Sequence, residues 1–314
     1  MTDAVVECVP NFSEGRDEEV VRAIVSAMRV DGVKLLDWSM DADHNRSVVT
    51  VAGEPQAVVE SAVRGVGRAA ELIDLTRQQG VHPRMGAADV VPFVPVQGIT
   101  LEQCALLARQ AGAEIWRRHA VPVYYYGAAA SRPDRANLED VRRGQFEQLR
   151  ETVLRDPART PDHGGPELHP TAGASAVGAR RFLVAFNIYF DSSDVSVVRQ
   201  MAKRIRASSG GLPGVKAMGV IVRGQAQLSM NITDLQAVSI SQAYEKAAEL
   251  AMQQRIALVR TELIGLLPEQ ACERDSEWMR LSIEFDPQLK VIERRLKSPM
   301  EWPAEMAAFS ARGI

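Results

Sequence analysis

The chain has 314 residues, of which 46% are hydrophobic, 25% charged and 5% aromatic, and 37 Lys and Arg against 40 Asp and Glu give a net charge of −3. At about 150 residues per domain, this length predicts two globular domains and excludes a disordered chain or a small disulfide-stapled fold. A charge so close to zero, with both signs interspersed, excludes a general surface for nucleic acid or anionic membranes.

The cysteines and the apolar runs predict a cytoplasmic protein. Cys8, Cys104 and Cys272 are odd in number and far apart, which favours free thiols in a reducing compartment. Residues 1–12 lack the basic and apolar regions of a signal peptide. The longest apolar stretch, 182–190, is far shorter than the ~20 residues of a membrane-spanning helix.

Hydrophobic periodicity in the first half of the chain predicts strands alternating with helices. The acidic run from Asp17 is typical of a helix start, and Pro55 suits the first turn of a long helix. Pro92 and Pro95 place the strand that contains them at a sheet edge or in irregular backbone. In chain order we expect a strand over 4–10, a helix from Asp17, strands over 33–37 and 47–52, a helix from Pro55, a loop over 80–88, a strand over 90–96, a helix over 101–118 and a strand over 121–126.

The rest of the chain predicts a second α/β subdomain. After a helix over 138–154 and an irregular segment over 156–176, the expected elements follow the order β-α-β-β-α-β, which is a split βαβ unit. They are a strand over 181–190, a helix over 194–207, strands over 215–222 and 225–232, a helix over 239–254 and a strand over 256–264. The first half opens with the same order. We therefore predict an α/β (α+β) fold with two βαββαβ-like subdomains and mixed sheets, the second ferredoxin-like: residues 1–179, and residues 180–314 with a C-terminal helical extension.

The segment Gly80-Val81-His82-Pro83-Arg84-Met85-Gly86-Ala87 is the first candidate for chemistry. The proline after His82 favours extended backbone and a stiff loop, and an imidazole with a pKa near 6.5 suits general acid–base catalysis. Arg84, two residues on, would lie on the same side and could hold a carboxylate. The alternative is a loop histidine that caps a turn.

The segment Asp41-Ala42-Asp43-His44-Asn45-Arg46-Ser47 gathers carboxylates, an imidazole, an amide and a guanidinium before a strand. A metal site is not predicted, because no second ligand cluster at a recognisable spacing accompanies it. Two alternatives remain open: a turn stabilised by Asx hydrogen bonds, or a substrate-binding role for Asn45 and Arg46.

The glycine-rich segment over 161–180 does not predict a nucleotide site. Gly173 and Gly178 have the spacing of a phosphate loop, but Ala179 and Arg180 replace its Lys and Ser/Thr, and a strand follows instead of a helix. The dinucleotide pattern G-x-G-x-x-G is also absent. What remains is a backbone surface that a flat ligand could approach closely. No cysteine or serine has the context of a covalent nucleophile, so direct transfer is expected.

Several of these stretches together resemble the glutamate formiminotransferase family, in both order and spacing, from about Val6 to Leu267. They are ECVPNFSEGR at 7–16, NRS at 45–47, HPRMGA at 82–87, VPVY at 121–124, and GAR at 178–180 with FLVAFNI at 182–188.

The resemblance implies that the protein transfers the formimino group of N-formimino-L-glutamate to N5 of tetrahydrofolate, in histidine degradation and one-carbon metabolism. Tetrahydrofolate would be a co-substrate, with no metal and no nucleotide, and the protein would be a homodimer. The family's catalytic histidine falls on His82. Its folate-binding loop falls on Gly164, Gly165, Pro166, Glu167, Leu168, His169, Pro170, Thr171, Ala172 and Gly173.

The chemistry of this transfer agrees with a single acid–base group. N5 must lose a proton while the departing glutamate nitrogen gains one, so one imidazole can act first as base and then as acid. We expect His82 to fill that role. Arg46 and Arg84, with Asn45, are the candidates for holding the glutamate carboxylates.

The sequence also departs from the family pattern. Tyr124 to Ala129 lacks an acidic residue that many relatives carry, and the pair Gly164-Gly165 contains one additional glycine, so the folate contacts are not predicted in detail. The chain also lacks the cyclodeaminase domain of bifunctional members, so we expect it to stop at the formimino product. Two alternatives are a formyltransferase acting on N-formylglutamate and a folate-binding homologue without turnover.

Overall fold

The computed structural model describes residues 4–80, 83–273, 276–283 and 285–304. The chain forms two compact units: Met1–Arg180 with Pro299–Ile314, and Arg181–Ser298. The described end of the chain packs with the first unit, where Met300 donates its backbone N–H to the Leu35 carbonyl at 2.8 Å. This differs from the expected division, which assigned the whole C-terminal segment to the second subdomain.

The first unit begins with the predicted β-α-β-β-α-β order, with one additional short strand. The elements are β1 (Val5–Cys8), β2 (Asn11–Phe12), α1 (Glu18–Ala27), β3 (Val33–Asp41), β4 (Arg46–Gly53), α2 (Pro55–Leu72) and β5 (Ala88–Gln97). Asp17 caps α1 by accepting the backbone N–H groups of Glu19 and Val20. Pro55 occupies the start of α2, where a missing N–H costs nothing. Both predicted helix starts are confirmed.

The first unit continues through α3 (Leu101–His119), β6 (Val123–Gly127), α4 (Leu138–Val141), α5 (Gln145–Thr152) and β7 (Ser175–Ala179), with single 3₁₀ turns at Pro133–Arg135 and Pro157–Arg159. The single helix predicted over 138–154 is wrong. Gly144 has φ +87° and Gln145 has φ +55°, and left-handed backbone of this kind ends one helix before the next begins.

The first sheet runs in the order β3-β4-(β1, β2)-β5-β7-β6, and β5, β7 and β6 are parallel. The predicted edge position of β5 is wrong, because β1 and β2 pair with one side of it and β7 with the other. The predicted irregularity is confirmed: the β1–β5 register shifts between Val5 and Val6, next to Pro95. Such a shift accommodates a residue that cannot donate a ladder hydrogen bond.

Strand β7 is a further correction, since the sequence predicted no strand between the irregular segment over 156–176 and the strand over 181–190. Its residues are small, Ser-Ala-Val-Gly-Ala, and all are buried. A Cβ on Gly178 would lie 2.5 Å from the Tyr126 ring, so the close packing of β7 against β6 requires a glycine there. Small residues of this kind have weak strand preference, which is why periodicity missed the strand.

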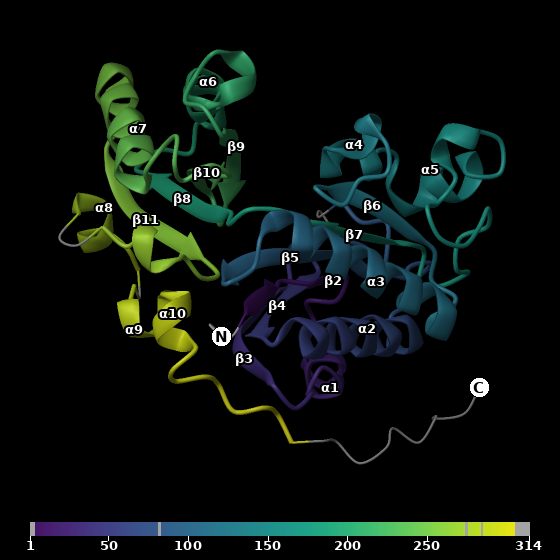
Figure 1. Ribbon diagram of the computed structural model, residues 1–314. Coiled ribbons are helices and arrows are strands. Elements are labelled where there is room, and N and C mark those ends of the chain that lie inside the picture. Colours follow the sequence, from purple (N-terminus) through teal and green to yellow (C-terminus); the bar gives the residue numbers. More distant parts are fainter. Residues whose placement is uncertain (1–3, 81–82, 274–275, 284, 305–314) are drawn as a thin grey trace. The chain divides into compact units, whose positions relative to one another are not determined.

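Helices α1, α2 and α3 cover one face of the first sheet (Figure 1). The core between them is apolar, and its largest fully buried side chains include Phe12, Phe93 and Ile24. The packing of these three helices on the sheet holds the strand ends in place, and the candidate site loops start from those strand ends.

The second unit confirms the ferredoxin-like prediction. Its elements are β8 (Val184–Phe190), α6 (Val195–Ile205), β9 (Val215–Val222), β10 (Gln225–Ile232), α7 (Ile240–Gln254) and β11 (Leu258–Ile264), followed by α8 (Glu277–Arg280), α9 (Pro287–Lys290) and α10 (Ile292–Arg295), with 3₁₀ turns at Ala207–Ser209 and Glu269–Ala271. The sheet order is β11-β8-β10-β9, and all neighbours are antiparallel. The expectation of a mixed sheet therefore holds for the first unit only. Trp278 is fully buried against Phe186 and Phe285.

None of the three cysteines, all of them among the described residues, forms a disulfide; Cys8 and Cys104 are buried and Cys272 is half-buried. Burial raises the pKa of Cys8 and raises that of Cys104 to about 12, so neither thiol ionises near neutral pH to act as a nucleophile. Among the described helices, none has the length and apolar character needed to cross a membrane.

Candidate functional site

His82, the predicted catalytic residue, lies outside the described residues, as does Val81. The described chain resumes at Pro83, and the site can be built from the segments that contact 83–87 and from those that contact 78–80. Four stretches that the sequence analysis singled out meet there: 12–16, 41–47, 83–89 and 169–174.

The 83–87 segment is fastened to the loop after β2. Ser13 donates its hydroxyl to the Gly86 carbonyl at 2.7 Å and its backbone N–H to the Ala87 carbonyl at 2.9 Å. A Cβ on Gly86 would lie 2.2 Å from the Ala174 carbonyl oxygen. The glycine is therefore required because two backbone segments approach each other closely at this point.

The second half of the predicted folate loop lies directly beside the 83–87 segment. Ala87 donates its backbone N–H to the Ala172 carbonyl at 2.9 Å, and Ala174 donates to the Met85 carbonyl at 3.0 Å. Gly173, between them, has φ +67°, and a Cβ there would lie 2.3 Å from the Met85 oxygen. Two predicted site segments are thus hydrogen-bonded to each other.

His169 shapes the turn at the end of this loop. Its Nδ1 accepts the backbone N–H of Ala172 at 3.0 Å and that of Thr171 at 3.4 Å. Burial lowers the pKa of His169, which keeps the ring neutral and Nδ1 available as an acceptor. The ring therefore acts on the loop backbone. Thr171 in turn accepts the Leu75 N–H at 2.8 Å.

The first half of the predicted folate loop contacts a different part of the unit. Gly164 and Gly165 both have positive φ, and a Cβ on Gly164 would lie 2.4 Å from the Trp116 ring. His163 pairs with β6 through the Val123 backbone and meets the Tyr125 ring edge-on at 5.6 Å. The additional glycine therefore lies in an exposed turn against the end of α3.

Asn45 ties three loops together. Its Oδ1 accepts the Gly15 N–H at 3.0 Å, while its Nδ2 donates to the Gln79 carbonyl at 3.1 Å and to the side chain of Gln78. The residue has φ +49°, a left-handed conformation that asparagine tolerates better than most residues. Both ends of the amide are engaged within the protein. Its predicted contact with a substrate carboxylate stays a prediction.

Glu14 is a further candidate residue, which the sequence motif contains but to which no role was assigned. One oxygen accepts the N–H groups of Arg16 at 2.8 Å and Asp17 at 3.0 Å, and the other accepts Gln78 Nε2 at 2.7 Å. Glu14 is 7% exposed. An acid in a predicted loop before a helix was the available signal, but its partner Gln78 is 64 residues away in the sequence.

The Arg84 side chain is directed into the protein, where it is hydrogen-bonded to the chain segment that precedes His82. Its guanidinium donates to the Gln78 carbonyl at 2.5 Å and pairs with Glu147 at 2.9 Å, and the side chain is 10% exposed. The Arg84 carbonyl accepts the Phe146 N–H at 2.8 Å, which joins the segment to α5. The predicted carboxylate clamp at Arg84 remains a prediction; its Nη2 already has internal partners, whereas its Nε is buried without a hydrogen-bond partner among the described residues.

A second buried carboxylate, that of Asp89, is hydrogen-bonded to the 83–87 segment. It is 1% exposed; Oδ1 accepts the Met85 N–H at 2.7 Å, and Oδ2 pairs with Arg142. Burial lowers the pKa of Arg46; the negative charge of Asp41 opposes this shift, and the positive charge of Arg142 adds to it. The sequence analysis missed Asp89 and Arg142. The signal for Asp89 was an acid at the start of an apolar strand.

The turn over 41–44 has the Asx geometry that one of the two alternatives describes. Asp41 accepts the N–H groups of Asp43 at 3.0 Å and His44 at 2.9 Å, and pairs with the His44 ring at 2.7 Å. Burial acts to raise the pKa of Asp41, but the hydrogen bonds and charge of His44 hold it below its usual value. In the part of the chain that the structure describes, no group of three or more His, Cys, Asp or Glu could hold a metal ion.

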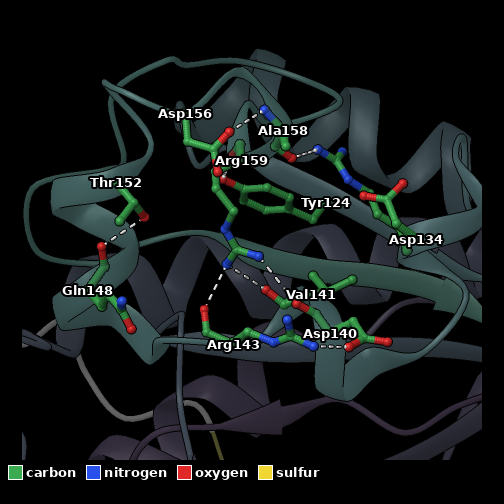
Figure 2. Close-up of a pocket in the computed structure, with 11 residues that line it drawn as sticks. Tyr124, Asp134, Asp140, Val141, Arg143, Gln148, Thr152, Asp156, Ala158 and Arg159 are labelled. Carbon is green, nitrogen blue, oxygen red and sulfur yellow. Dashed lines mark hydrogen bonds and ion pairs between the residues drawn. The ribbon is translucent and has the colours of Figure 1, made fainter.

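A cavity of about 510 Å³ opens in the first unit beside Tyr124, α4 and α5 (Figure 2). The Arg159 guanidinium donates to the carbonyls of Asp140 at 3.2 Å, Val141 at 3.0 Å and Arg143 at 2.8 Å. Tyr124 donates its hydroxyl to the Arg159 carbonyl at 2.5 Å. Arg159 thus stabilises the C-terminal end of α4 and the residues that follow it, and none of the predicted site residues lines this cavity.

Comparison with known proteins gives matches over most of the chain. The profile of the formiminotransferase domain, N-terminal subdomain, matches residues 5–180, and that of the formiminotransferase domain matches residues 185–294. A glutamate formimidoyltransferase of Streptococcus pyogenes serotype M1 is 41% identical over 295 residues, covering 93% of this chain and 98% of that protein. One of Thermoplasma acidophilum is 43% identical over 273 residues, covering 85% and 89%. A formimidoyltransferase-cyclodeaminase of Mus musculus is 38% identical, covering 85% of this chain and 51% of that protein.

Proposed function

The chain belongs to the formiminotransferase domain family, and we propose that it is a glutamate formimidoyltransferase. Its reaction is transfer of the formimino group from N-formimino-L-glutamate to N5 of tetrahydrofolate. The observation that supports this most strongly is the identity of 41% and 43%, over nearly the full length of two proteins of that name. Tetrahydrofolate acts as a co-substrate in this reaction.

The reaction needs one group that can both accept and donate a proton, close to N5 of tetrahydrofolate and to the amino nitrogen of glutamate. The N5 lone pair attacks the formimino carbon, and the π electrons of its C=N bond move onto the imino nitrogen, which gives a tetrahedral adduct. N5 then loses its proton to a base, the glutamate nitrogen receives a proton from the same group, and the C=N bond re-forms as the bond between the glutamate nitrogen and the carbon breaks. By the family resemblance we assign this role to His82. Positioned acid–base help of this kind contributes typically ~10²–10⁴-fold.

The described residues support the assignment by what they hold in place. Ser13 fixes Gly86 and Ala87, Asp89 fixes Met85, and Arg84 anchors its own segment to Gln78 on the other side of His82. Transfer between two bound substrates depends on fixed relative positions, because a misplacement of about 1 Å can cost about 10²-fold in rate. The hydrogen-bonded frame provides such positions.

For the folate loop we assign Gly164 to Gly173, again by resemblance. The hydrogen bonds from Ala172 and Ala174 to the 83–87 segment bring its second half beside the chain that carries the proposed base. This supports a pterin-binding role for the second half. Gly164 is half-buried and Gly165 is exposed, and backbone without side chains at this point suits the less specific task of admitting the rest of the folate. We further propose that the enzyme is cytoplasmic and homodimeric.

The donor assay separates this function from its nearest alternative. The purified protein is incubated with tetrahydrofolate and either N-formimino-L-glutamate or N-formyl-L-glutamate, and the folate product and released glutamate are measured. We expect turnover with the formimino donor. Turnover with the formyl donor alone would assign the formyltransferase reaction. Folate binding without product from either donor, in a single-turnover experiment, would indicate a non-catalytic homologue.

A further inference from the structure

A buried ion pair precedes the start of the assigned folate loop. Arg135 donates from Nη1 to Asp162 Oδ2 at 2.5 Å, and the two side chains are only 6% and 9% exposed. Asp162 lies two residues before Gly164, and Arg135 is the last residue of the 3₁₀ turn Pro133–Arg135. The pair therefore joins two segments of the first unit that are 27 residues apart in the sequence.

The Asp162 carboxylate accepts hydrogen bonds from three parts of the first unit. Besides Arg135, its Oδ2 accepts the Tyr125 backbone N–H at 2.8 Å, and its Oδ1 accepts the Ser131 hydroxyl. The Asp162 backbone N–H donates to the Val123 carbonyl at 2.8 Å. Asp162 therefore fastens the chain before the loop both to β6 and to the segment that follows β6.

Arg135 also holds the backbone that leads to Asp162. Its Nη2 donates to the Thr160 carbonyl at 2.5 Å and to the Ala158 carbonyl at 3.3 Å. Its guanidinium carbon lies 5.1 Å from the centre of the Tyr124 ring, where a cation–π attraction adds to the hydrogen bonds. The planar guanidinium thus contacts the carboxylate and the preceding backbone at the same time, and a compact ammonium group lacks this geometry.

Stability alone is a poor explanation for this ion pair. Burying two charges costs desolvation, and apolar side chains of similar volume are often at least as stabilising. A buried pair does fix geometry, because each donor requires its acceptor at a given distance and direction. The pair at Arg135 and Asp162 is therefore suited to hold a segment whose position matters.

The residues that follow Asp162 depend on such a fixed starting point. Gly164 and Gly165 have φ values of +79° and +85° and no side chains that could anchor them. Because glycine is the most permissive residue, the path of this turn depends on the contacts of the flanking residues. On the N-terminal side these contacts are those of Asp162 and the bridge between His163 and Val123.

We propose that Arg135 and Asp162 are positioning residues for the folate loop, which they hold in the conformation that binds tetrahydrofolate. This rests on the proposed function and deepens it, since it adds two residues outside the loop to those that determine folate affinity. A loop that is ordered before binding loses less conformational freedom when the ligand binds. The pair therefore acts on the affinity for tetrahydrofolate and leaves the chemical step to other residues.

The test compares Arg135→Met with Arg143→Met. The Arg143 side chain is 76% exposed and pairs with Asp140, so this control removes a positive charge from the same unit without touching Asp162. We expect Arg135→Met to raise Kd and KM for tetrahydrofolate about tenfold, while kcat and KM for formiminoglutamate change less than about twofold. Arg143→Met should leave all four at wild-type values.

A double variant separates positioning from a loss of stability. Arg135→Met alone leaves the Asp162 charge buried without its partner, whereas Arg135→Met combined with Asp162→Asn leaves no unpaired charge and should recover much of the lost stability. A positioning role predicts that Kd for tetrahydrofolate stays raised in the double variant, because the link to Thr160 and Ala158 is still missing. Recovery of the wild-type Kd together with the stability would overturn the proposal.

Two milder variants keep the proposal testable if Arg135→Met does not fold. Arg135→Lys keeps the charge but loses the planar fork, and Ser131→Ala removes one hydrogen bond to Asp162 from an exposed residue. We expect each to raise Kd for tetrahydrofolate about two- to fivefold. An unchanged Kd in both folded variants would overturn the proposal.

A binding measurement separates this proposal from the proposed function. Calorimetry with tetrahydrofolate and no donor reports on the loop without any turnover. If the wild type binds tetrahydrofolate but transfers no formimino group, the function fails, while weaker binding in Arg135→Met still supports the positioning role. If the wild type transfers the group and Arg135→Met binds tetrahydrofolate as tightly as the wild type, the positioning role fails and the function stands.

Discussion

The two units bury different kinds of side chains. In the described part of the second unit, the buried polar residues are Asn187, Gln227 and Thr261, and its core is otherwise apolar and regular. The first unit buries many more, and several of them meet around the 83–89 segment: Ser13, Glu14, Asn45, Arg84 and Asp89. The difference separates a unit whose stability comes from apolar packing from one that also fixes loops with polar contacts.

Buried polar contacts cost desolvation, but they specify geometry more sharply than apolar packing does. Each donor requires its acceptor at a given distance and direction, whereas an apolar core tolerates rearrangement at constant volume. In the polar network of the first unit, Glu14 and Asn45 hold the chain at Gln78 and Gln79, before His82. Ser13 and Asp89 hold the chain after it. We infer that the network serves the reaction, and that the apolar core of the second unit serves stability.

The largest expected change in stability comes from the core of the second unit. Trp278→Ala removes a fully buried ring that packs on Phe186 and Phe285, and we expect a loss of about 3–5 kcal/mol in the free energy of unfolding. Urea denaturation measures it, and kcat per folded molecule should stay near the wild-type value. Met252→Ala, at a side chain 73% exposed, should change the stability by less than about 0.5 kcal/mol. A loss of kcat without a loss of stability in Trp278→Ala would break the comparison.

An intermediate effect is expected from the polar network of the first unit. Asn45→Ala leaves the Gly15 N–H without its acceptor and frees Gln78 and Gln79, which should cost about 1–3 kcal/mol. We also expect kcat to fall by about tenfold or more, because the loop that leads to His82 loses its anchor.

The matched control for this change lies in the second unit. Thr261 is fully buried and donates its hydroxyl to the Trp278 carbonyl at 2.7 Å, so Thr261→Val removes one buried hydrogen bond of similar energy. Its stability should fall comparably while kcat remains unchanged. Equal losses of kcat in Asn45→Ala and Thr261→Val would show that the two units do not differ in this way.

The smallest effect is a pH dependence at the folate loop. The folded pKa of His169 is lowered by burial, so folding favours the neutral ring that accepts the Ala172 and Thr171 N–H groups. This contribution is fully present above the ordinary histidine pKa of about 6.5 and is lost as the pH falls through the lowered folded value. KM for tetrahydrofolate should therefore rise as the pH falls below about 6.5.

The control for the pH effect is His169→Asn, whose amide oxygen can accept an N–H group without titrating. In this variant the rise of KM at low pH should be absent or clearly reduced. A wild-type pH profile that persists unchanged in His169→Asn would assign the titration to another group. His119, whose pKa burial also lowers, is the second described histidine to consider.

The fold could be predicted from the sequence wherever periodicity and caps agree. The β-α-β-β-α-β order of both units followed from apolar spacing and from signals such as Asp17 and Pro55. Strand β7 did not, because its small residues have little strand preference of their own and are held by neighbours on both sides. The break at Gly144 was also missed, since one glycine does not by itself end a helical pattern.

The candidate site was predictable at its segments but not at its contacts. The motif strings over 45–47 and 82–87 marked loops whose neighbouring residues the structure connects, since Asn45 bonds Gln79 and Ser13 bonds Gly86. The roles of Asp89 and Arg142 depend on a pairing across 53 residues of sequence, which no local pattern reveals. The same holds for Glu14 and Gln78.

The exchange of His82 for Asn tests the central claim most directly, because asparagine keeps a polar side chain but cannot relay a proton. Wild type and His82→Asn are compared in the formimino transfer assay, with tetrahydrofolate binding measured in parallel. We expect turnover to fall by at least ~10²-fold while tetrahydrofolate binding changes little. Turnover of His82→Asn at the wild-type rate would contradict the account.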